Sequence, residues 1–164
     1  GSDALEAGVE QQLYRLAEKT GLSAKYSVRS GDEAVTRLRV SGSSEYALAC
    51  HIGAAFPLGV GSSGAVLMIE AGKAEMARVE SLIPGGTQAV TAFRKRVHQA
   101  RSQGWCRDRG SHHPSVHSLS VPVHSTGGQL AGALSLIGLP EQFNDEGSLR
   151  EVLLNSLRCL REKT

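Results

Sequence analysis

The sequence predicts an α+β fold with a mainly antiparallel β-sheet, and three observations carry this prediction. Leucines and valines recur at helical spacing near both ends of the chain. Between them lie strand-like runs joined by short turns, and short connections favour antiparallel neighbours. Helices and strands do not alternate regularly along the chain, which argues against a doubly wound parallel sheet.

The first third of the chain is predicted to form one helix and three strands. The helix covers residues 3–21, where Gly21 can end it, and its apolar stripe consists of Leu5, Val9, Leu13 and Leu16. The strand-like runs that follow are separated by turns rich in glycine and serine, and they cover residues 24–30, 34–40 and 46–52. These three runs are expected to lie side by side in the sheet.

The rest of the chain is predicted to contain four helices, one short strand and one hairpin. The helices cover the leucine-rich end of the chain after Asp145 and residues 62–71, 73–82 and 87–103. The short strand, at residues 105–107, leads into a polar loop. The hairpin consists of strands at residues 116–124 and 129–137, joined by a Ser-Thr-Gly-Gly turn.

One face of the predicted hairpin is lined by small and hydroxyl side chains. Side chains alternate across a strand, so leucines and valines fall on the face that suits packing on helices. The opposite face carries Val116, Ser118, Ser120, Pro122, Ala131, Ala133, Ser135 and Ile137. Covered by loops, this face would form a concavity with a few hydrogen-bonding groups, which is typical of a small-ligand site. The alternative interpretation is a weakly polar sheet surface that faces solvent.

The charge pattern does not predict a DNA-binding surface within this chain. The formal net charge is only +2, and no block of like charges is present. The densest basic stretch, residues 94–96, lies within a helical pattern and is interpreted as a solvated helix face. A domain that binds DNA by itself would carry a concentrated basic face.

The composition suits a single cytoplasmic domain. The three cysteines are an odd number at wide spacings, which fits a reducing cytoplasm better than a disulfide framework. No apolar run approaches the ~20 residues that a membrane span needs, so no membrane partner is predicted. Gly1 and Ser2 are interpreted as the remnant of an expression tag on a piece of a longer protein, which leaves residues 3–164 as one domain.

The glycine-rich stretch at residues 59–64 is not predicted to bind a nucleotide. No lysine followed by serine or threonine comes after its last glycine, and no β-α-β unit surrounds it. Backbone amides at the start of a helix do attract anions. A carboxylate held by the amides of Ser62 and Ser63 is therefore the preferred interpretation.

No metal, cofactor or catalytic group is predicted. The spacing of Cys106, His112, His113 and His117 matches no common zinc site. Neighbouring residues of a strand point to opposite faces, which argues against a nucleophile–base pair of Ser118 with His117. No G-x-S-x-G motif is present. The chain is thus not expected to be an enzyme, although a small hydrolase or a ligand-free dimerisation module remain the alternatives.

Several motifs, in their order and spacing, resemble the effector-binding domain of IclR-type transcription regulators. The first is I-G-A-A-F-P-L at residues 52–58, which leads into G-S-S-G at 61–64 and an apolar helix. The second comprises Gly-Trp at residues 104–105, S-L-S-V-P-V at 118–123 and a closing strand within 128–138. With the first and last helices, the resemblance covers nearly the whole chain.

This resemblance implies a GAF-like fold, a curved antiparallel sheet with helices on one face and an effector pocket on the other. It also implies a winged-helix DNA-binding domain before residue 1, joined through the helix at residues 3–21. The implied partners are a small organic effector and further copies of the chain in a dimer or tetramer. DNA would be bound only through the domain before residue 1.

The family's ligand contacts map onto six positions of this sequence: Ser62, Ser63, Asp108, Ser118, Ser135 and Ile137. The glycine-turn amides that hold a carboxylate in the family correspond to Ser62 and Ser63. The aspartate that follows Gly-Tyr in the family corresponds to Asp108, and the pocket cysteine corresponds to Ser118. The resemblance therefore implies that these six residues contact the effector.

The closing strand departs from the family pattern in one position that affects the choice of effector. Ser135 matches the first serine of that strand, but Ile137 replaces the second. The acidic pair that often follows the family aspartate is also absent, with Gly110 and Ser111 in its place. Because Ile137 makes the pocket less polar, a larger or more apolar effector is predicted, such as an aromatic or aliphatic acid. The pocket must then hold a six-membered ring.

Overall fold

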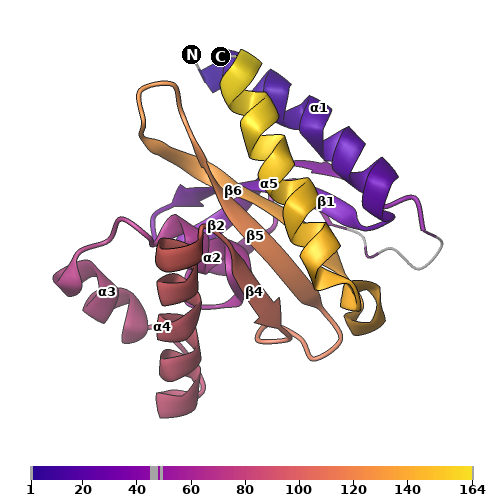
Figure 1. Cartoon of the computed structure of the whole chain (residues 1–164). Coiled ribbons are helices and arrows are strands. Elements are labelled where there is room, and N and C mark those ends of the chain that lie inside the picture. The colour runs from indigo at the N-terminus through magenta and orange to yellow at the C-terminus, as the bar shows by residue number, and fades with distance from the viewer. Residues whose placement is uncertain (1, 45–47, 49, 164) are drawn as a thin grey trace.

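The computed structural model describes residues 2–44, 48 and 50–163, which form one curled antiparallel sheet with helices packed against it (Figure 1). In chain order the elements are α1 (Ser2–Thr20), β1 (Ser23–Ser30), β2 (Glu33–Val40), β3 (Ala55–Pro57), α2 (Gly61–Leu67), α3 (Lys73–Glu80), α4 (Gly86–Gln103), β4 (Cys106–Arg109), β5 (His117–His124), β6 (Leu130–Gly138), the 3-10 helix η1 (Pro140–Phe143) and α5 (Glu146–Lys163).

The six strands lie in the order β3-β2-β1-β6-β5-β4, and every neighbouring pair is antiparallel. The first strand of the chain therefore pairs with the last one at the centre of the sheet, where Tyr26 lies opposite Leu134. The predicted hairpin, β5–β6, is present, and the first two predicted strands, β1 and β2, pair side by side as expected. This confirms the α+β class and the antiparallel sheet.

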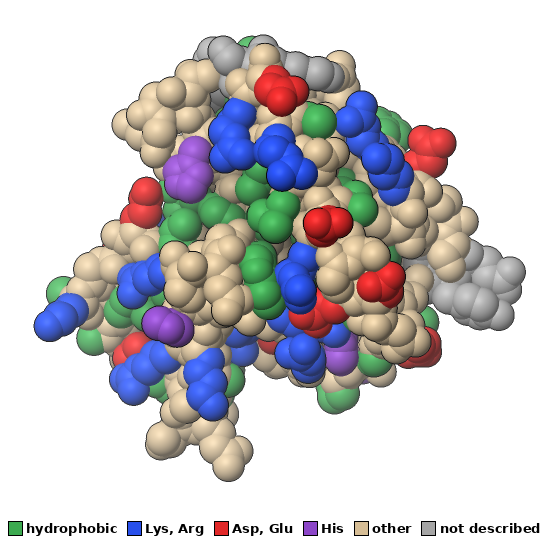
Figure 2. Space-filling view, viewed as in Figure 1, with side chains coloured by type: hydrophobic (Ala, Val, Ile, Leu, Met, Phe, Trp, Pro, Cys, Tyr) green, Lys and Arg blue, Asp and Glu red, His purple; other side chains and the backbone are tan. Residues whose placement is uncertain are grey.

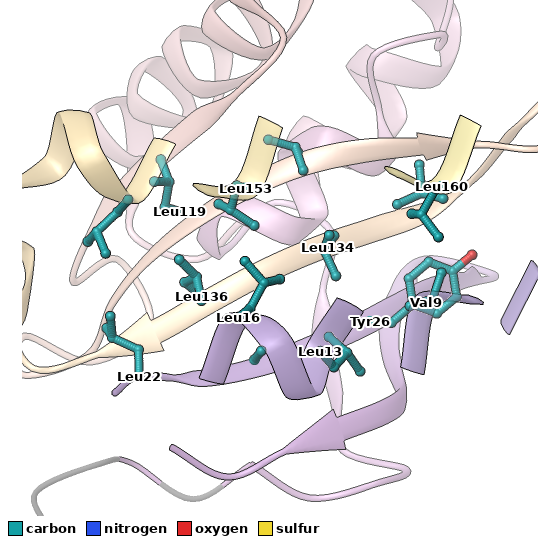
Figure 3. Close-up of a cluster of buried hydrophobic side chains, with 14 of the residues drawn as sticks. Val9, Leu13, Leu16, Leu22, Tyr26, Leu119, Leu134, Leu136, Leu153 and Leu160 are labelled. Carbon is teal, nitrogen blue, oxygen red and sulfur yellow. The ribbon is translucent and has the colours of Figure 1, made fainter. Parts of the chain in front are cut away.

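The helices α1 and α5 lie side by side on one face of the sheet, which we call the helix face (Figure 1). The predicted stripe of α1 is buried there, since Val9, Leu13 and Leu16 are fully covered. From the sheet, Tyr26, Leu119, Leu134 and Leu136 point into the same cluster, and Leu153 and Leu160 of α5 close it (Figure 3). Burial of these side chains holds the first and last helices on the sheet.

The opposite face, which we call the pocket face, is covered in part by α2, which packs on β4, β5 and β6. A second apolar cluster joins α2 to α3 and α4, with Met68, Phe93 and Val97 at its centre. Within α2 the backbone passes so close to the chain before it that a Cβ atom on Gly64 would lie 2.1 Å from the carbonyl oxygen of Leu58. Only glycine permits this approach.

The strand predicted at residues 46–52 is wrong where the structure describes it. Residues 45–47 and 49 lie outside the described residues, while Leu48, Cys50 and His51 have no regular secondary structure. The third strand is β3, which begins after a turn at Gly53, where φ is +88°. The backbone of Thr36 on β2 bonds to Gly53 and Ala54, so the chain reaches the sheet edge only after this turn. Leu48, Cys50 and His51 line a cavity instead.

Two predicted helices end earlier than expected. The helix expected at residues 62–71 ends at Leu67, and the one expected at 73–82 ends at Glu80. Beyond α2, the guanidinium of Arg101 donates hydrogen bonds to the carbonyl oxygens of Ile69 and Ala71, both at 2.8 Å. This side chain takes over the carbonyl groups that a longer helix would have bonded internally.

Basic and acidic side chains are interspersed on the face drawn in Figure 2, and hydrophobic side chains gather in a strip between them. This agrees with the small formal net charge of +2. None of the helices in the described part of the chain is long and apolar enough to cross a membrane.

The close approach at Gly64 predicts the effect of adding a single methyl group. Gly64→Ala is expected to lower the free energy of unfolding by about 1–3 kcal/mol, because the new Cβ overlaps the backbone of Leu58. Urea denaturation followed by circular dichroism measures the change. Gly127→Ala is the control, since a Cβ there meets only Ser125 at 3.9 Å. Equal midpoints for the two variants would contradict the packing argument.

Candidate small-molecule site

A cavity of about 260 Å³ lies on the pocket face, bounded by the segment before β3, the start of α2 and the strands β1, β4, β5 and β6. All six residues named from the family resemblance line this cavity: Ser62, Ser63, Asp108, Ser118, Ser135 and Ile137. They come from α2 and from the strands β4, β5 and β6. Four of the eight residues on the hairpin face that was expected to carry small and hydroxyl side chains form one wall of the cavity: Val116, Ser118, Ser135 and Ile137.

Four serine hydroxyls form a hydrogen-bonded row along this wall. The Oγ atom of Ser62 lies 2.6 Å from the Oγ atoms of both Ser118 and Ser120. Ser120 continues the row to Ser135, with 2.5 Å between the Oγ atoms. The register explains the row, because Ser120 on β5 lies opposite Ser135 on β6. The first turn of α2 is therefore joined to the sheet through side-chain hydroxyls.

Asp108 on β4 lies beside this row, directly opposite Ser118. It is only 4% exposed, and its Oδ2 atom accepts a hydrogen bond of 3.1 Å from the backbone amide of Ser111. Its Oδ1 atom lies 3.5 Å from the guanidinium of Arg96, which is also buried. The negative charge of Asp108 is thus partly balanced inside the protein.

The interpretation of residues 94–96 as a solvated helix face is wrong for one of the three residues. Arg94 and Lys95 are exposed, and Arg94 makes two hydrogen bonds to Glu80. Arg96 instead points inward, where it donates a 3.1 Å hydrogen bond to the carbonyl oxygen of Gly59 and pairs with Asp108. A helix period of 3.6 residues puts neighbouring residues on different faces, so this difference could have been noticed in the sequence.

Lys25 on β1 is a cavity residue that the sequence analysis missed. Its side chain lines the cavity, is 8% exposed and places Nζ 4.8 Å from the centre of the Phe56 ring. Burial lowers the pKa of Lys25 from its usual value, because the charged ammonium loses water. The alternation of β1 could have revealed it, since Ala24 and Tyr26 lie in the apolar core and Lys25 must point the other way.

The segment before β3 and the loop after β4 complete the cavity wall. Leu48, Cys50 and His51 line it from the first segment, and the hydroxyl of Ser23 on β1 donates a hydrogen bond to the carbonyl oxygen of Leu48. From the second segment, His112 meets Phe56 edge to face, with 4.8 Å between the ring centres. Aromatic and aliphatic groups thus lie around the polar row.

The residues weighed for metal binding or catalysis are not assembled for either. No group of three His, Cys, Asp or Glu side chains is close enough to hold a metal ion within the described ranges. His117 points away from the cavity, and Arg107 donates a 2.9 Å hydrogen bond to its Nδ1 atom. In the described part of the chain, neither histidine of the cavity wall bonds to a serine hydroxyl or a cysteine thiol. The pattern of a nucleophile beside an oriented base is not formed by these residues.

The cavity is large enough for the six-membered ring that the apolar side chain of Ile137 led us to expect in the effector. An engineered cavity of about 150 Å³ in another protein holds benzene, and this cavity, at about 260 Å³, is larger. A six-membered ring with one or two small substituents therefore fits. A second hollow, between the β5–β6 turn and α5, contains none of the six predicted residues.

Comparison with known proteins assigns the chain to a family. The sequence profile described as "Bacterial transcriptional regulator IclR C-terminal" matches residues 3–162. The chain is also similar to the HTH-type transcriptional regulator RhmR of Escherichia coli (strain K12), with 24% identity over 141 residues. That match covers 82% of this chain and 54% of RhmR, so the chain spans about half the length of this curated relative.

Solved structures with the same fold agree with this assignment. An IclR homolog from Microbacterium hydrocarbonoxydans, solved in complex with 4-hydroxybenzoate, has a TM-score of 0.83 and 19% identity, over 98% of this chain and 68% of that chain. The IclR of Thermotoga maritima has a TM-score of 0.81 and 16% identity, over 97% of this chain and 68% of that chain. With the profile match across residues 3–162, the chain belongs to the IclR family of bacterial transcriptional regulators, as a C-terminal regulatory domain.

Proposed function

We propose that this domain senses a small organic acid and passes the signal to a DNA-binding domain of the same regulator. The observation that carries the proposal is the single cavity that brings together all six residues expected to contact an effector. The cavity combines apolar walls with a few convergent polar groups, which is the usual composition of a small-ligand site.

The chemistry of the cavity favours an acid that contains a ring. Ser62, Ser63, Ser118 and Ser135 offer hydroxyl and backbone groups for hydrogen bonds, while Ile137 keeps part of the wall apolar. The Microbacterium hydrocarbonoxydans homolog is in complex with 4-hydroxybenzoate, an aromatic acid of suitable size for this cavity. We therefore infer that the effector is a small carboxylate, and that an aromatic one is the first class to test.

Signalling would follow from a difference in effector affinity between two arrangements of the domains. An effector shifts such an equilibrium only as far as it binds one arrangement better than the other. A coupling free energy of about 1–3 kcal/mol changes DNA affinity by roughly 5–150-fold, which is enough for regulation. The helix α1 would carry the signal, because it leads toward the expected winged-helix domain before residue 1.

The complete regulator is expected to work in the cytoplasm as a homo-oligomer. Most regulators that bind symmetric DNA half-sites are themselves symmetric dimers or tetramers. DNA contact would belong to the winged-helix domain, because the basic residues of this chain are not concentrated into a block.

Binding of a small acid can be tested with a panel of aliphatic and aromatic carboxylates that includes 4-hydroxybenzoate. At 100 times Kd a ligand stabilises a protein by about 2.7 kcal/mol, so the melting temperature should rise by roughly 5–10 °C. In Ser118→Ala the affinity for the best compound should fall roughly 3–10-fold, because one hydrogen-bonding group is lost. Ser102→Ala on the exposed side of α4 is the matched control. A panel that leaves the melting temperature unchanged contradicts the proposal.

The cysteines offer a second test, which reports where the ligand binds. Cys50 lines the cavity, whereas Cys159 lies on α5 and is also partly exposed. A bound ligand should slow alkylation of Cys50 and leave Cys159 unchanged. Burial raises the pKa of Cys106 to about 12, so this thiol should stay unmodified until the protein unfolds. Peptide mass spectrometry after a timed reaction measures all three rates. Equal protection of Cys50 and Cys159 would place the ligand elsewhere.

A further inference from the structure

We propose that Lys25 binds the carboxylate of the effector, and that the effector is an aromatic monocarboxylate lying across the sheet with its charged end at β1 and its other end toward β4. This inference rests on the proposed function of the cavity as the effector site. It moves the carboxylate from the amides of Ser62 and Ser63, where the family resemblance places it, to Lys25, and it adds a charge requirement and a direction of binding.

The register of the sheet places Lys25 beside the row of serine hydroxyls. Lys25 on β1 lies directly opposite Ser135 on β6, and residues directly opposite each other in an antiparallel pair share a face at about 4.5–5.5 Å. The ammonium of Lys25 and the hydroxyl of Ser135 both line the cavity. Together they offer a positive charge and a hydrogen-bond donor to one carboxylate.

Lys25 has no carboxylate within ion-pair distance among the residues that the structure describes. Its nearest aromatic contact is Phe56, whose ring centre lies 4.8 Å from Nζ, and an aromatic ring stabilises a cation without supplying a formal negative charge. The other buried cation near the cavity, Arg96, already pairs with Asp108. A buried charge without a partner of opposite sign is unfavourable, so a ligand carboxylate at Lys25 would gain a strong interaction in a site with little water.

The charges of the cavity are separated across the sheet. Lys25 lies on β1 and Asp108 on β4, with β6 and β5 between them. Three steps between neighbouring strands, at about 4.8 Å each, place the two strands roughly 14 Å apart along the curled sheet. A ligand with a carboxylate at Lys25 therefore extends toward Asp108, with its ring against Ile137 and Phe56.

This separation also determines the direction of binding. A carboxylate placed at the β4 side would face the carboxylate of Asp108, and like charges repel. A hydroxyl at that side could instead donate to Asp108, because a carboxylate accepts more hydrogen bonds than Arg96 and Ser111 supply. An acid with a second carboxylate at its far end should therefore be rejected.

The test compares benzoate with benzamide, which has the same shape and no charge, by isothermal titration calorimetry. In Lys25→Met the affinity for benzoate should fall at least about 10-fold, because a charged hydrogen bond is lost, while the affinity for benzamide stays within roughly twofold. Lys95→Met, on the exposed side of α4, is the control and should bind both compounds as the unchanged protein does. Lys25→Arg, which keeps the charge, should retain the preference for benzoate. Thermal melts establish that each variant is folded.

A second pair of ligands tests the direction. Terephthalate, which has carboxylates at both ends, should bind at least about 10-fold more weakly than 4-carbamoylbenzoate, which has the same size and one carboxylate. Equal affinities would overturn the direction of binding.

The outcomes separate this inference from the proposed function. If benzoate and benzamide bind equally well, or if Lys25→Met leaves the affinity for benzoate unchanged, the role of Lys25 is overturned while the cavity remains a ligand site. If other compounds of the wider panel bind but benzoate does not, the inference again fails alone. If no compound binds at all, charged or neutral, the proposed function fails with it.

Discussion

The attachment of α2 to the pocket face of the sheet is the contact on which the candidate site depends. Two features hold this short helix in place: Ser62 bonds to two serines of β5, and the absence of a side chain at Gly64 lets the backbone approach Leu58. The attachment also fixes the loop after β4, because the amide of Gly61 donates a 2.9 Å hydrogen bond to the hydroxyl of Ser111. Ser111 in turn holds Asp108. The short helix α2 thus positions the serines of β5, the backbone at Leu58 and the loop after β4 relative to one another.

The strand β6 belongs both to the core and to the cavity. Leu134 and Leu136 point into the cluster beneath α1 and α5, whereas Ser135 and Ile137 point into the cavity. A strand that is anchored by buried leucines on one face presents its other face in a fixed position. The buried leucines of β6 thus hold the polar groups of the cavity wall in position, which favours ligand binding with little rearrangement.

Patterns with a strict period were the most informative part of the sequence. The two faces of the β5–β6 hairpin could be assigned because alternation over eight or nine residues leaves one arrangement only. The stretch at residues 46–52 has a similar alternation, but its described residues Leu48, Cys50 and His51 lie along the cavity outside any strand, and β3 begins only after the turn at Gly53. Local pattern cannot distinguish these cases, because the difference lies in whether a neighbouring strand is available for pairing.

The charged residues of the site were harder to predict for a different reason. The periods of β1 and α4 place Lys25 and Arg96 on inward faces, but their residue types suggest the surface, since lysine and arginine are rarely buried. Their burial follows from the neighbours that the tertiary fold brings to them, Phe56 for Lys25 and Asp108 for Arg96. Asp108 was found through the family resemblance, whereas no motif marks its partner.

The number of protons in the row of serine hydroxyls limits how the row can bond to a ligand. Four hydroxyls carry four protons, and the three bonds between them use three, so one proton remains to be donated outside the row. In the described part of the chain, neither end of the row bonds to another group. When every bond points the same way, the spare proton sits either on Ser135, beside Lys25, or on Ser118, beside Asp108. If the hydroxyl at one end of the row donates its proton to a ligand, the hydroxyl at the other end can only accept a hydrogen bond. The hydroxyls of Ser118 and Ser135 therefore cannot both donate to the ligand while the three bonds of the row are kept.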